Sequence, residues 1–278
     1  MTQIWKKIKP PEYSAVEAYL LKREAFCVGA CSKFITRNFN HMWAYQNIRG
    51  EIEALLLHNK LSLYPIFSGN QHIPIPRFMS RFLKKVSIHS LQGLKADAER
   101  LERSMESQGC RAEDRIDYDL MTLDREPLPE SFLRGPSGLV LRKPLPAETD
   151  KLFPLQSAYE QEEVVPRGGV FNPASCRRTL EKLISSRLIM AACLGNEIVG
   201  KININAVSYN RYQIGGVYVQ PEYRGLGIAI RMSAVFLKQL FAEGKGITLF
   251  VKKRNTPARS VYHRLGFTVS GDYRICYY

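Results

Sequence analysis

Residues 217–229, VYVQPEYRGLGIA, are the stretch on which the interpretation of this chain depends. An apolar segment typical of a buried strand runs into a turn that contains Gly225 and Gly227, and an apolar helical pattern follows to residue 241. Glycine lets the backbone approach a ligand closely and lets several N–H groups point at one place. A helix N-terminus adds about half a positive charge there. The stretch therefore predicts a phosphate cradle. The alternative is a tight turn that needs its glycines for geometry alone.

The turn belongs to neither of two common nucleotide-binding motifs. It lacks the pattern G-x-G-x-x-G of dinucleotide sites, and no G-K-[ST] follows it as in a P-loop. Arg224–Ala229, RGLGIA, instead fits [QR]-x-x-G-x-[GA]. A second segment, with Asn255, Ala258, Tyr262 and then Gly266-Phe267, fits N-x-x-A-x-x-x-Y-x-x-x-G-F. These two motifs in register resemble those of the GNAT superfamily of acyl-CoA N-acyltransferases, over residues 138–278.

The resemblance implies roles for particular residues. The pyrophosphate of acyl-CoA would lie on the turn amides, and its pantetheine arm would pair with a strand edge that a bulge at Gly215-Gly216 opens. Tyr262 would protonate the departing thiolate as general acid. The alternative for Tyr262 is an aromatic side chain packed in the core. The implied acetyl-CoA contacts are Val217, Tyr218, Val219, Arg224, Gly225, Leu226, Gly227, Ile228, Ala229 and Asn255.

The general base is the least specific part of the prediction. The strand that starts at Tyr212 offers no carboxylate, whereas AYEQEEVVP holds Glu160, Glu162 and Glu163. A tandem subgroup of GNAT proteins carries a similar Glu-Glu-Val segment, which makes Glu163 the predicted base and Glu162 its neighbour. The alternative is an acid-rich helix end that is simply solvated.

The first half of the chain resembles that tandem subgroup as a degenerate repeat. Residues 50–54, GEIEA, and 196–200, NEIVG, lie 146 positions apart, and each precedes an apolar run. Residues 51–57 and 61–67 predict a hairpin. Residues 90–94, SLQGL, stand where a phosphate loop would be, but they hold one glycine and no preceding arginine. The first half is therefore expected to have an architectural role.

A cluster of proline and glycine at 126–146 predicts the domain boundary. We expect an α/β (α+β) chain of the GNAT fold, with a mixed central sheet flanked by helices, in two domains: a degenerate half, 1–135, and a catalytic half, 136–278. In the second half we predict helices at 173–186, 227–241 and 256–265. We predict strands there at 187–193, 197–206, 212–220, 247–251 and 267–277.

Composition narrows the function classes. The chain has 278 residues, 45% hydrophobic and 24% charged, which is typical of a globular protein. No apolar run reaches the roughly 18 residues of a membrane span, and no signal peptide is visible, so a cytoplasmic protein is expected. The six cysteines and five histidines show no metal-ligand spacing, and reduced thiols without a metal are expected.

The net charge of +14 includes twelve Lys and Arg against three acids in residues 201–278. Such a region attracts phosphate, although no nucleic-acid-binding motif accompanies it. The leading prediction is an N-acetyltransferase that moves the acetyl group of acetyl-CoA to a primary amine. The acceptor stays open among protein amines, amino acids, polyamines and antibiotics, and the oligomeric state is not predicted. The alternative is a non-catalytic acyl-CoA-binding regulatory protein of GNAT fold.

Overall fold

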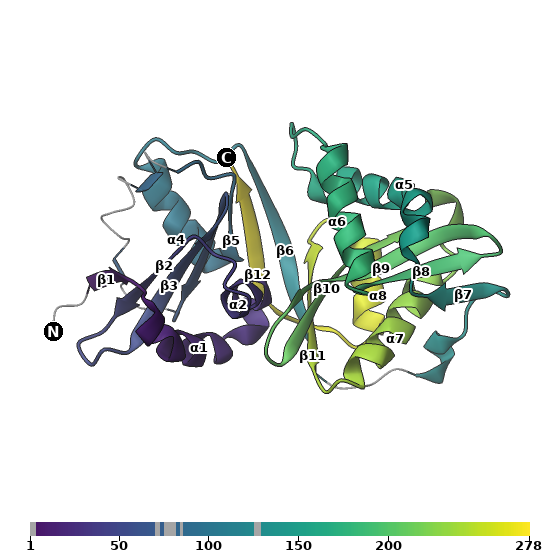
Figure 1. The fold of residues 1–278 in the computed structure, drawn as a ribbon, viewed down its shortest axis with the longest axis horizontal. Helices are drawn as coiled ribbons and strands as arrows, with labels where there is room; N and C mark the ends of the chain where they lie inside the picture. Colours follow the sequence, from purple (N-terminus) through teal and green to yellow (C-terminus); the bar gives the residue numbers. More distant parts are fainter. Residues whose placement is uncertain (1–3, 70–72, 75–81, 84–85, 125–128) are drawn as a thin grey trace. The chain divides into compact units, whose positions relative to one another are not determined.

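The structure, a computed structural model, describes residues 4–69, 73–74, 82–83, 86–124 and 129–278 (Figure 1). The chain divides into two compact units, neither of them continuous in sequence. Unit 1 comprises Met1–Leu120, Phe250–Lys253 and Val269–Tyr278, and unit 2 comprises Met121–Leu249 and Arg254–Thr268. The units therefore differ from the predicted ranges 1–135 and 136–278, because the end of the chain returns to unit 1.

The two units carry similar series of elements. Unit 1 contains β1 (Ile4–Lys7), α1 (Tyr13–Leu21), α2 (Val28–Ile35), β2 (His41–Gln46), β3 (Ile52–Asn59), β4 (Ser62–Phe67), β5 (Ser90–Leu94), α4 (Lys95–Glu106), most of β6 (Asp114–Leu123) and most of β12 (Thr268–Tyr277). Unit 2 contains β7 (Leu139–Arg142), α5 (Thr149–Tyr159), the π-helix η5 (Glu160–Val164), α6 (Pro173–Ser185), β8 (Ile189–Leu194), β9 (Glu197–Val207), β10 (Arg211–Val219), α7 (Ile228–Phe241), most of β11 (Gly246–Lys252) and α8 (Thr256–Arg264). Short 3-10 helices are η1 (Pro10–Glu12), η2 (Glu24–Phe26), η3 (Glu130–Leu133), η4 (Pro146–Glu148) and η6 (Pro221–Tyr223).

Strand pairing confirms the duplicated mixed α/β fold. In unit 1, β1 to β4 pair antiparallel in chain order, and β5 then joins β4 in parallel. In unit 2, β7 to β10 pair antiparallel in the same order, and β11 joins β10 in parallel. The two similar segments, GEIEA and NEIVG, begin in the turns before β3 and β9 and continue into these strands. Parallel neighbours need a crossover, and α7 supplies it in unit 2.

The predicted elements of the second half are present, with ends that differ by one or two residues. Helix α6 begins where the Asn-Pro pair indicates: the Asn172 side chain accepts a hydrogen bond from Ser175 N at 2.9 Å, and Pro173 takes the first helical position. The predicted boundary segment 126–146 contains η3, β7 and the start of η4, and its residues 126–128 lie outside the described part of the chain. Strand β7 was not predicted from its Pro/Gly-rich surroundings.

Residues 90–94 are a correction to the sequence analysis. They form strand β5, in which Ser90 and Leu91 pair with Ser62 and Leu63 of β4, and not a phosphate loop. Its glycine serves close strand packing, because a Cβ on Gly93 would lie 2.9 Å from Pro65 O. The short run was misread because one glycine indicates a turn or a close approach equally well.

The last strand, β12, lies between β5 and β6 in the sheet of unit 1. It pairs antiparallel with β5 from Tyr273–Leu94 to Tyr277–Ser90. On β6, Asp117 accepts hydrogen bonds from Arg274 Nε at 2.7 Å and from Lys95 Nζ at 2.8 Å. These contacts join β6, α4 and β12 in one charged network.

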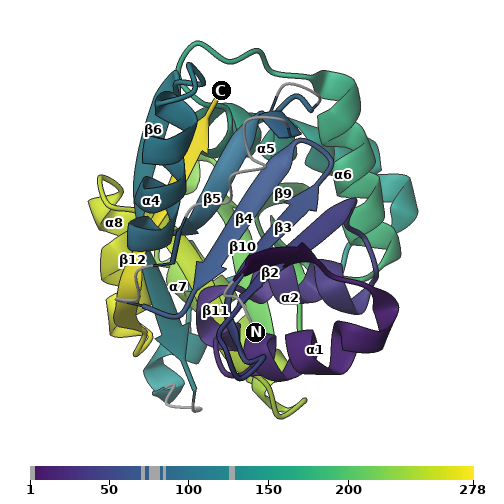
Figure 2. The same cartoon turned by 90° about the vertical axis from the view of Figure 1, so that its left-hand side faces the viewer.

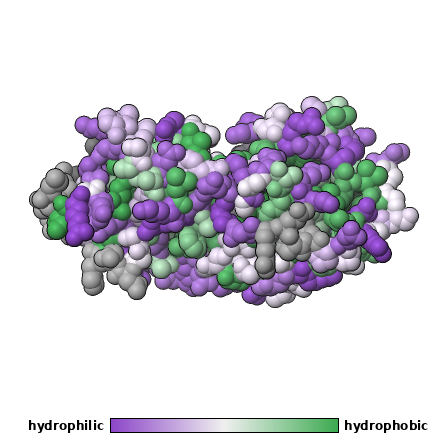
Figure 3. All heavy atoms as spheres, turned by 90° about the horizontal axis from the view of Figure 1, so that it is seen from below, coloured by the Kyte–Doolittle hydropathy of each residue, from purple (hydrophilic) through white to green (hydrophobic). Residues whose placement is uncertain are grey.

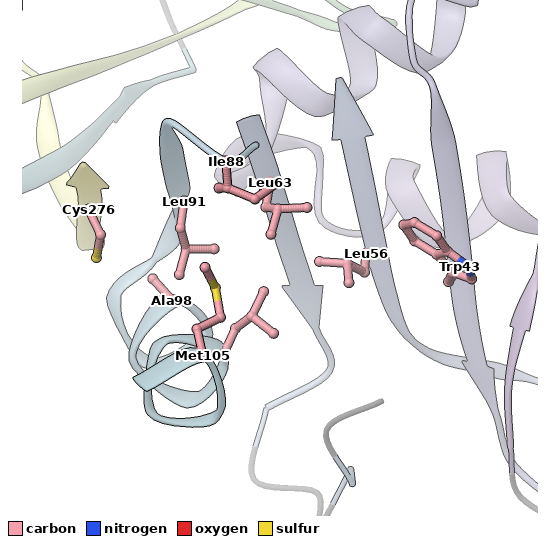
Figure 4. Packing of buried hydrophobic residues seen from close by; sticks show 9 residues of the cluster. Trp43, Leu56, Leu63, Ile88, Leu91, Ala98, Met105 and Cys276 are labelled. Atoms are coloured by element: carbon pink, nitrogen blue, oxygen red, sulfur yellow. The ribbon is translucent and has the colours of Figure 1, made fainter. Parts of the chain in front are cut away.

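Helices cover both faces of the unit 1 strands (Figure 2). One face packs against α4 in a buried cluster in which Leu56, Leu63 and Leu91 come from three adjacent strands (Figure 4). On the other face lie α1 and α2, whose buried residues include Val16, Leu20 and Phe34. Side chains alternate across a strand, so the Leu-rich run of β3 supplies both faces. The α4-side cluster comprises Trp43, Leu56, Leu63, Ile88, Leu91, Ala98, Leu101, Met105 and Cys276.

Unit 2 is built in the same way. Helices α5 and α6 bury Leu152, Leu180 and Ile184 against β8 and β9. Helix α7 is buried along most of its length and contacts β8, β9 and β10. Each large apolar side chain that is fully buried in this way stabilises the fold by roughly 1.5–3 kcal/mol. The strands of unit 2 thus pack against α5 and α6 as well as against α7.

Surface features are consistent with these covered sheets. The face in Figure 3 carries many hydrophilic side chains with hydrophobic ones scattered among them. All six cysteines are free thiols, and five are buried. Within the described residues, no helix is long and apolar enough to cross a bilayer, and no cluster of His, Cys, Asp and Glu is arranged to hold a metal ion.

Candidate functional site

Strands β10 and β11 run parallel at their start and then separate. Arg211–Gln213 pair with Gly246–Thr248, and the register of β10 against β9 shifts after Gln213 and again between Gly215 and Tyr218. The second shift is the predicted bulge. Gly216 has φ +60, and a Cβ there would overlap the Asn203 side chain. The bulge turns Val217–Val219 away from a regular ladder, as the motif implies.

The glycine turn follows the end of β10 directly. Gly225 has φ +81 and Gly227 has φ +77, and Gly227 is the N-cap of α7. Within the part of the chain that the structure describes, a Cβ built on Gly225 or Gly227 has no atom within 4 Å apart from those of its chain neighbours. The first N–H groups of a helix have no partner inside the helix. Backbone donors at the start of α7 therefore adjoin open space, which is the arrangement that binds phosphate.

Arg224 does not extend into that open space. Its Nε donates to Val219 O at 3.0 Å, and its Nη2 donates to Glu162 Oε2 at 3.2 Å. The Tyr218 hydroxyl donates to Glu162 Oε1 at 2.5 Å. Burial, together with the Glu162 carboxylate, raises the pKa of Tyr218 to about 12. Glu162 thus links the strand edge to the glycine turn.

Glu162 and Glu163 occupy a π-helix at the end of α5. This segment, η5, is closed by a hydrogen bond from Val165 N to Glu160 O at 2.8 Å. Single π-turns often accompany functional sites, because the inserted residue redirects neighbouring side chains. Here adjacent carboxylates reach two different partners. Glu163 Oε1 accepts a hydrogen bond from Asn255 Nδ2 at 3.1 Å, so the acidic segment is engaged with the site.

Asn255 has a structural role that the motif alone does not show. Its Oδ1 accepts a hydrogen bond from Ala258 N at 3.1 Å and so caps α8, while its amide group holds Glu163. Pro257 stands in the first turn of the same helix. The N-cap fixes where α8 begins and therefore where Tyr262 lies.

Tyr262 lies on α8 with 7% of its surface exposed. Its ring packs edge-on against Phe267 at a centroid distance of 5.7 Å. Burial raises the pKa of its phenol above the usual value, and the nearby Tyr159 and Glu163 act in the same direction. The hydroxyl is therefore protonated at neutral pH. The packing and the functional interpretations of Tyr262 both have support in its surroundings.

One buried polar residue of the site escaped the sequence analysis. Lys201, on β9 opposite Tyr218, is fully buried. Its Nζ donates to Gly216 O at 2.9 Å and to Asn203 Oδ1 at 3.1 Å. A lone lysine in an apolar strand was the available signal, in the run EIVGKININ. Lysine is almost never fully buried unless it has partners.

Unit 1 has an analogous strand separation but different side chains. Parallel pairing of β4 and β5 covers only Ser62–Ser90 and Leu63–Leu91, and a cavity of about 490 Å³ follows, lined by residues of unit 1. Counted from the start of each helix, Leu101 of α4 takes the place of Tyr262 of α8. Asp97 Oδ2 accepts a hydrogen bond from Phe67 N at 3.0 Å, so a side chain of unit 1 already occupies this backbone donor at the end of β4.

Known proteins give a family match for part of this chain and a similar fold for nearly all of it. Residues 152–267 match the acetyltransferase (GNAT) family. The search of curated proteins found no match. Among solved structures, a GCN5-related N-acetyltransferase from Sphaerobacter thermophilus has a TM-score of 0.62 at 18% identity, covering 98% of this chain and 94% of that one.

Two further structures extend the likeness over the whole chain. A Drosophila protein has a TM-score of 0.66 at 14% identity, covering 100% of this chain and 99% of that one. A tandem GNAT protein from the clavulanic acid biosynthesis pathway has a TM-score of 0.61 at 13% identity, covering 99% and 98%. At these identities the likeness concerns the fold. The family match supports acyltransferase activity. Residues 152–267 thus match the acetyltransferase (GNAT) family, and the fold of the chain is similar to that of a tandem GNAT protein.

Proposed function

We propose that the protein transfers the acetyl group of acetyl-CoA to a primary amine, and that unit 2 performs the transfer. The observation that carries the proposal is the separation of β10 from β11, followed directly by open backbone donors at the start of α7. The first feature suits a pantetheine arm, and the second suits its pyrophosphate. Together with the family match, they support acetyl-CoA as the donor.

The proton transfers use two side chains of unit 2. Glu163 takes a proton from the substrate ammonium, and the neutral nitrogen attacks the carbonyl carbon of the thioester. A C–N bond forms, the C–S bond breaks, and the departing thiolate takes the proton of the Tyr262 hydroxyl. The nitrogen returns a proton to the phenolate as it becomes an amide. Burial keeps Tyr262 in the protonated form that this step requires.

A second function, of a different class, has one observation in its favour. Burial raises the pKa of the Tyr262 phenol, and a phenol with a raised pKa donates its proton less readily to a thiolate. A protein that holds acyl-CoA without transferring the acyl group would tolerate this. We place it second because Asn255 holds Glu163 by a hydrogen bond, and Glu163 lies close enough to Tyr262 to raise the pKa of its phenol.

The test is a screen of amine acceptors against acetyl-CoA, with CoA release and acetylated product both measured. Protein N-termini, lysine peptides, amino acids, polyamines and aminoglycosides form the panel. Glu163→Gln tests the base and is expected to lower turnover at neutral pH. Glu181→Gln, on the exposed side of α6, is the matched control. Binding of acetyl-CoA with no product from any acceptor would favour the second function, and no binding at all would refute both.

A further inference from the structure

The bulge that opens the candidate donor site rests on a buried amine. Gly215 pairs with Asn203 and Tyr218 pairs with Lys201, so Gly216 and Val217 together face the single residue Ile202. Such an extra residue interrupts the ladder and leaves a backbone carbonyl that needs another donor. The Gly216 carbonyl oxygen accepts a hydrogen bond from Lys201 Nζ at 2.9 Å.

The surroundings of Lys201 hold its amine in one place. Its second acceptor is Asn203 Oδ1 at 3.1 Å, and Nζ lies 4.3 Å from the centroid of the Tyr159 ring. Asn203 Nδ2 in turn donates to Asn205 Oδ1 at 2.7 Å. These three polar residues alternate along β9 and therefore share one face of the strand. The ladder of side chains ends at the bulge of β10.

We propose that Lys201 is a positioning residue, whose amine holds the Gly216 carbonyl and so fixes the β10 bulge that presents Val217–Val219 to the donor thioester. The functional part rests on the proposed acetyl-CoA site, whereas the structural part stands without it. Lys201 has no direct contact with the reacting atoms in this role, because its side chain is fully buried.

A lysine suits this position better than a side chain with a single donor. The amine has at least two N–H groups in either protonation state, one for each acceptor. Glycine at 216 is the matching requirement on β10, because any side chain there would overlap Asn203 and approach Lys201 Nζ. The bulge therefore depends both on the amine of Lys201 and on the absence of a side chain at Gly216.

The test compares Lys201→Met, which keeps most of the stem and loses the amine, with Ile202→Val, its fully buried neighbour on β9. Amide hydrogen exchange is measured without ligand. We expect the Gly216–Tyr218 amides of Lys201→Met to exchange about tenfold faster, as the loss of one buried hydrogen bond implies. Ile202→Val should leave them unchanged. Equal exchange in both variants would overturn the proposal.

Kinetics then separate positioning from general destabilisation. We expect Lys201→Met to raise KM for acetyl-CoA about tenfold with little change in KM for the amine, since only the donor edge is disturbed. A uniform fall in active enzyme, with both KM values unchanged, would contradict the functional part. If the wild-type chain binds no acetyl-CoA, the proposed function fails, and hydrogen exchange still decides the role of Lys201.

Asn203→Ala covers the case in which Lys201→Met does not fold. This variant removes the second acceptor and leaves the amine and its bond to Gly216. A smaller increase in exchange at the same three amides is expected. No increase there would count against the arrangement, whatever the fate of Lys201→Met.

Discussion

At the scale of single residues, Tyr262 is a side chain whose chemistry and packing can be separated. Tyr262→Phe keeps the ring against Phe267 and removes only the hydroxyl. We expect kcat to fall by about 10²–10⁴-fold, the usual range for a general acid, with acetyl-CoA affinity and melting temperature nearly unchanged. Single-turnover kinetics measure the chemical step directly.

The control for this prediction is Tyr212→Phe, which removes another buried phenol of unit 2. Tyr212 donates to Glu243, and burial with that carboxylate raises its pKa to about 12. This variant should keep wild-type kcat. Tyr262→Ala should unfold more easily, by about 3–5 kcal/mol, whichever role Tyr262 has. Wild-type single-turnover rates in Tyr262→Phe would remove the hydroxyl from the mechanism.

The burial of Lys201 also predicts how the stability of the fold depends on pH. Burial lowers its pKa to about 7, against an ordinary value of about 10.4. Above pH 7 the unfolded chain therefore binds a proton that the folded chain does not. Stability from this group rises with pH through that window. Urea unfolding at pH 7.0, 7.5, 8.0 and 8.5 should show that the free energy of unfolding of the wild type increases with pH relative to that of Lys201→Met.

The groups around Lys201 limit the window but do not reverse the sign. Glu160 and Cys176 both favour the charged amine, and the Tyr159 ring does so too. Burial raises the pKa of Cys176 to about 12, which makes that thiol destabilising above about pH 8.5. Measurements from pH 7.0 to 8.5 stay below the range in which the cysteine contributes. A difference that falls with pH would contradict the prediction.

At the scale of elements, the start of α7 is tested by a pair of glycines with the same backbone. Gly227 has φ +77 and Gly244 has φ +76, and a Cβ on either meets open space. Alanine at each position should cost roughly 1–2 kcal/mol of stability through the left-handed conformation. Only Gly227→Ala should weaken acetyl-CoA binding in calorimetry, because its methyl group enters the space beside the helix donors. Equal affinities in the two variants would place the pyrophosphate elsewhere.

The network that holds β12 in unit 1 predicts an acid-sensitive contribution to stability. Hydrogen bonds from Arg274 and Lys95 lower the pKa of Asp117 to about 2. The ionised carboxylate therefore stabilises the fold above its unfolded pKa of about 3.9, and this stability is lost as pH falls from about 4 to 2. Asp117→Asn should be less stable at pH 6 and lose less on acidification.

Unfolding followed between pH 6 and 2 measures this effect. Asp150→Asn is the comparison, since the Asp150 carboxylate pairs with Arg177 but has 82% of its side chain exposed. An exposed pair contributes about 0–1 kcal/mol, so this variant should follow the wild-type pH profile. Parallel profiles for Asp117→Asn and wild type would show that the network adds nothing in solution.

At the scale of the whole molecule, the duplicated fold raises the question of how many donor sites one chain has. We predict one acetyl-CoA per chain, bound by unit 2. In unit 1 the Phe67 N–H is taken by Asp97, and Leu101 stands where α8 has Tyr262. Calorimetry on the wild type should give a stoichiometry of one. A stoichiometry of two would contradict the prediction and indicate that unit 1 also takes the donor.

The sequence alone determined the local features of this protein. The glycine turn, the cap of α6 and the order of elements in the second half could all be predicted from it. Each depends on steric limits and hydrogen bonds among residues that are close in sequence. The resemblance to the GNAT family followed from two such motifs in register, and residues 152–267 match that family. The Glu-Glu-Val segment lies beside Asn255, which donates a hydrogen bond to Glu163, and the role of Glu163 as the base stays a prediction.

Tertiary structure decided the features that depend on distant partners. Segment 90–94 is a strand because β4 and β12 lie on either side of it, and no local pattern distinguishes that from a loop. The last strand joins unit 1 because Arg274 and its neighbours find partners more than a hundred residues away. Lys201 is buried because a bulge on another strand needs its amine. Strand pairing and burial are set by contacts that a sequence pattern does not record, so these properties appear only when the chain is folded.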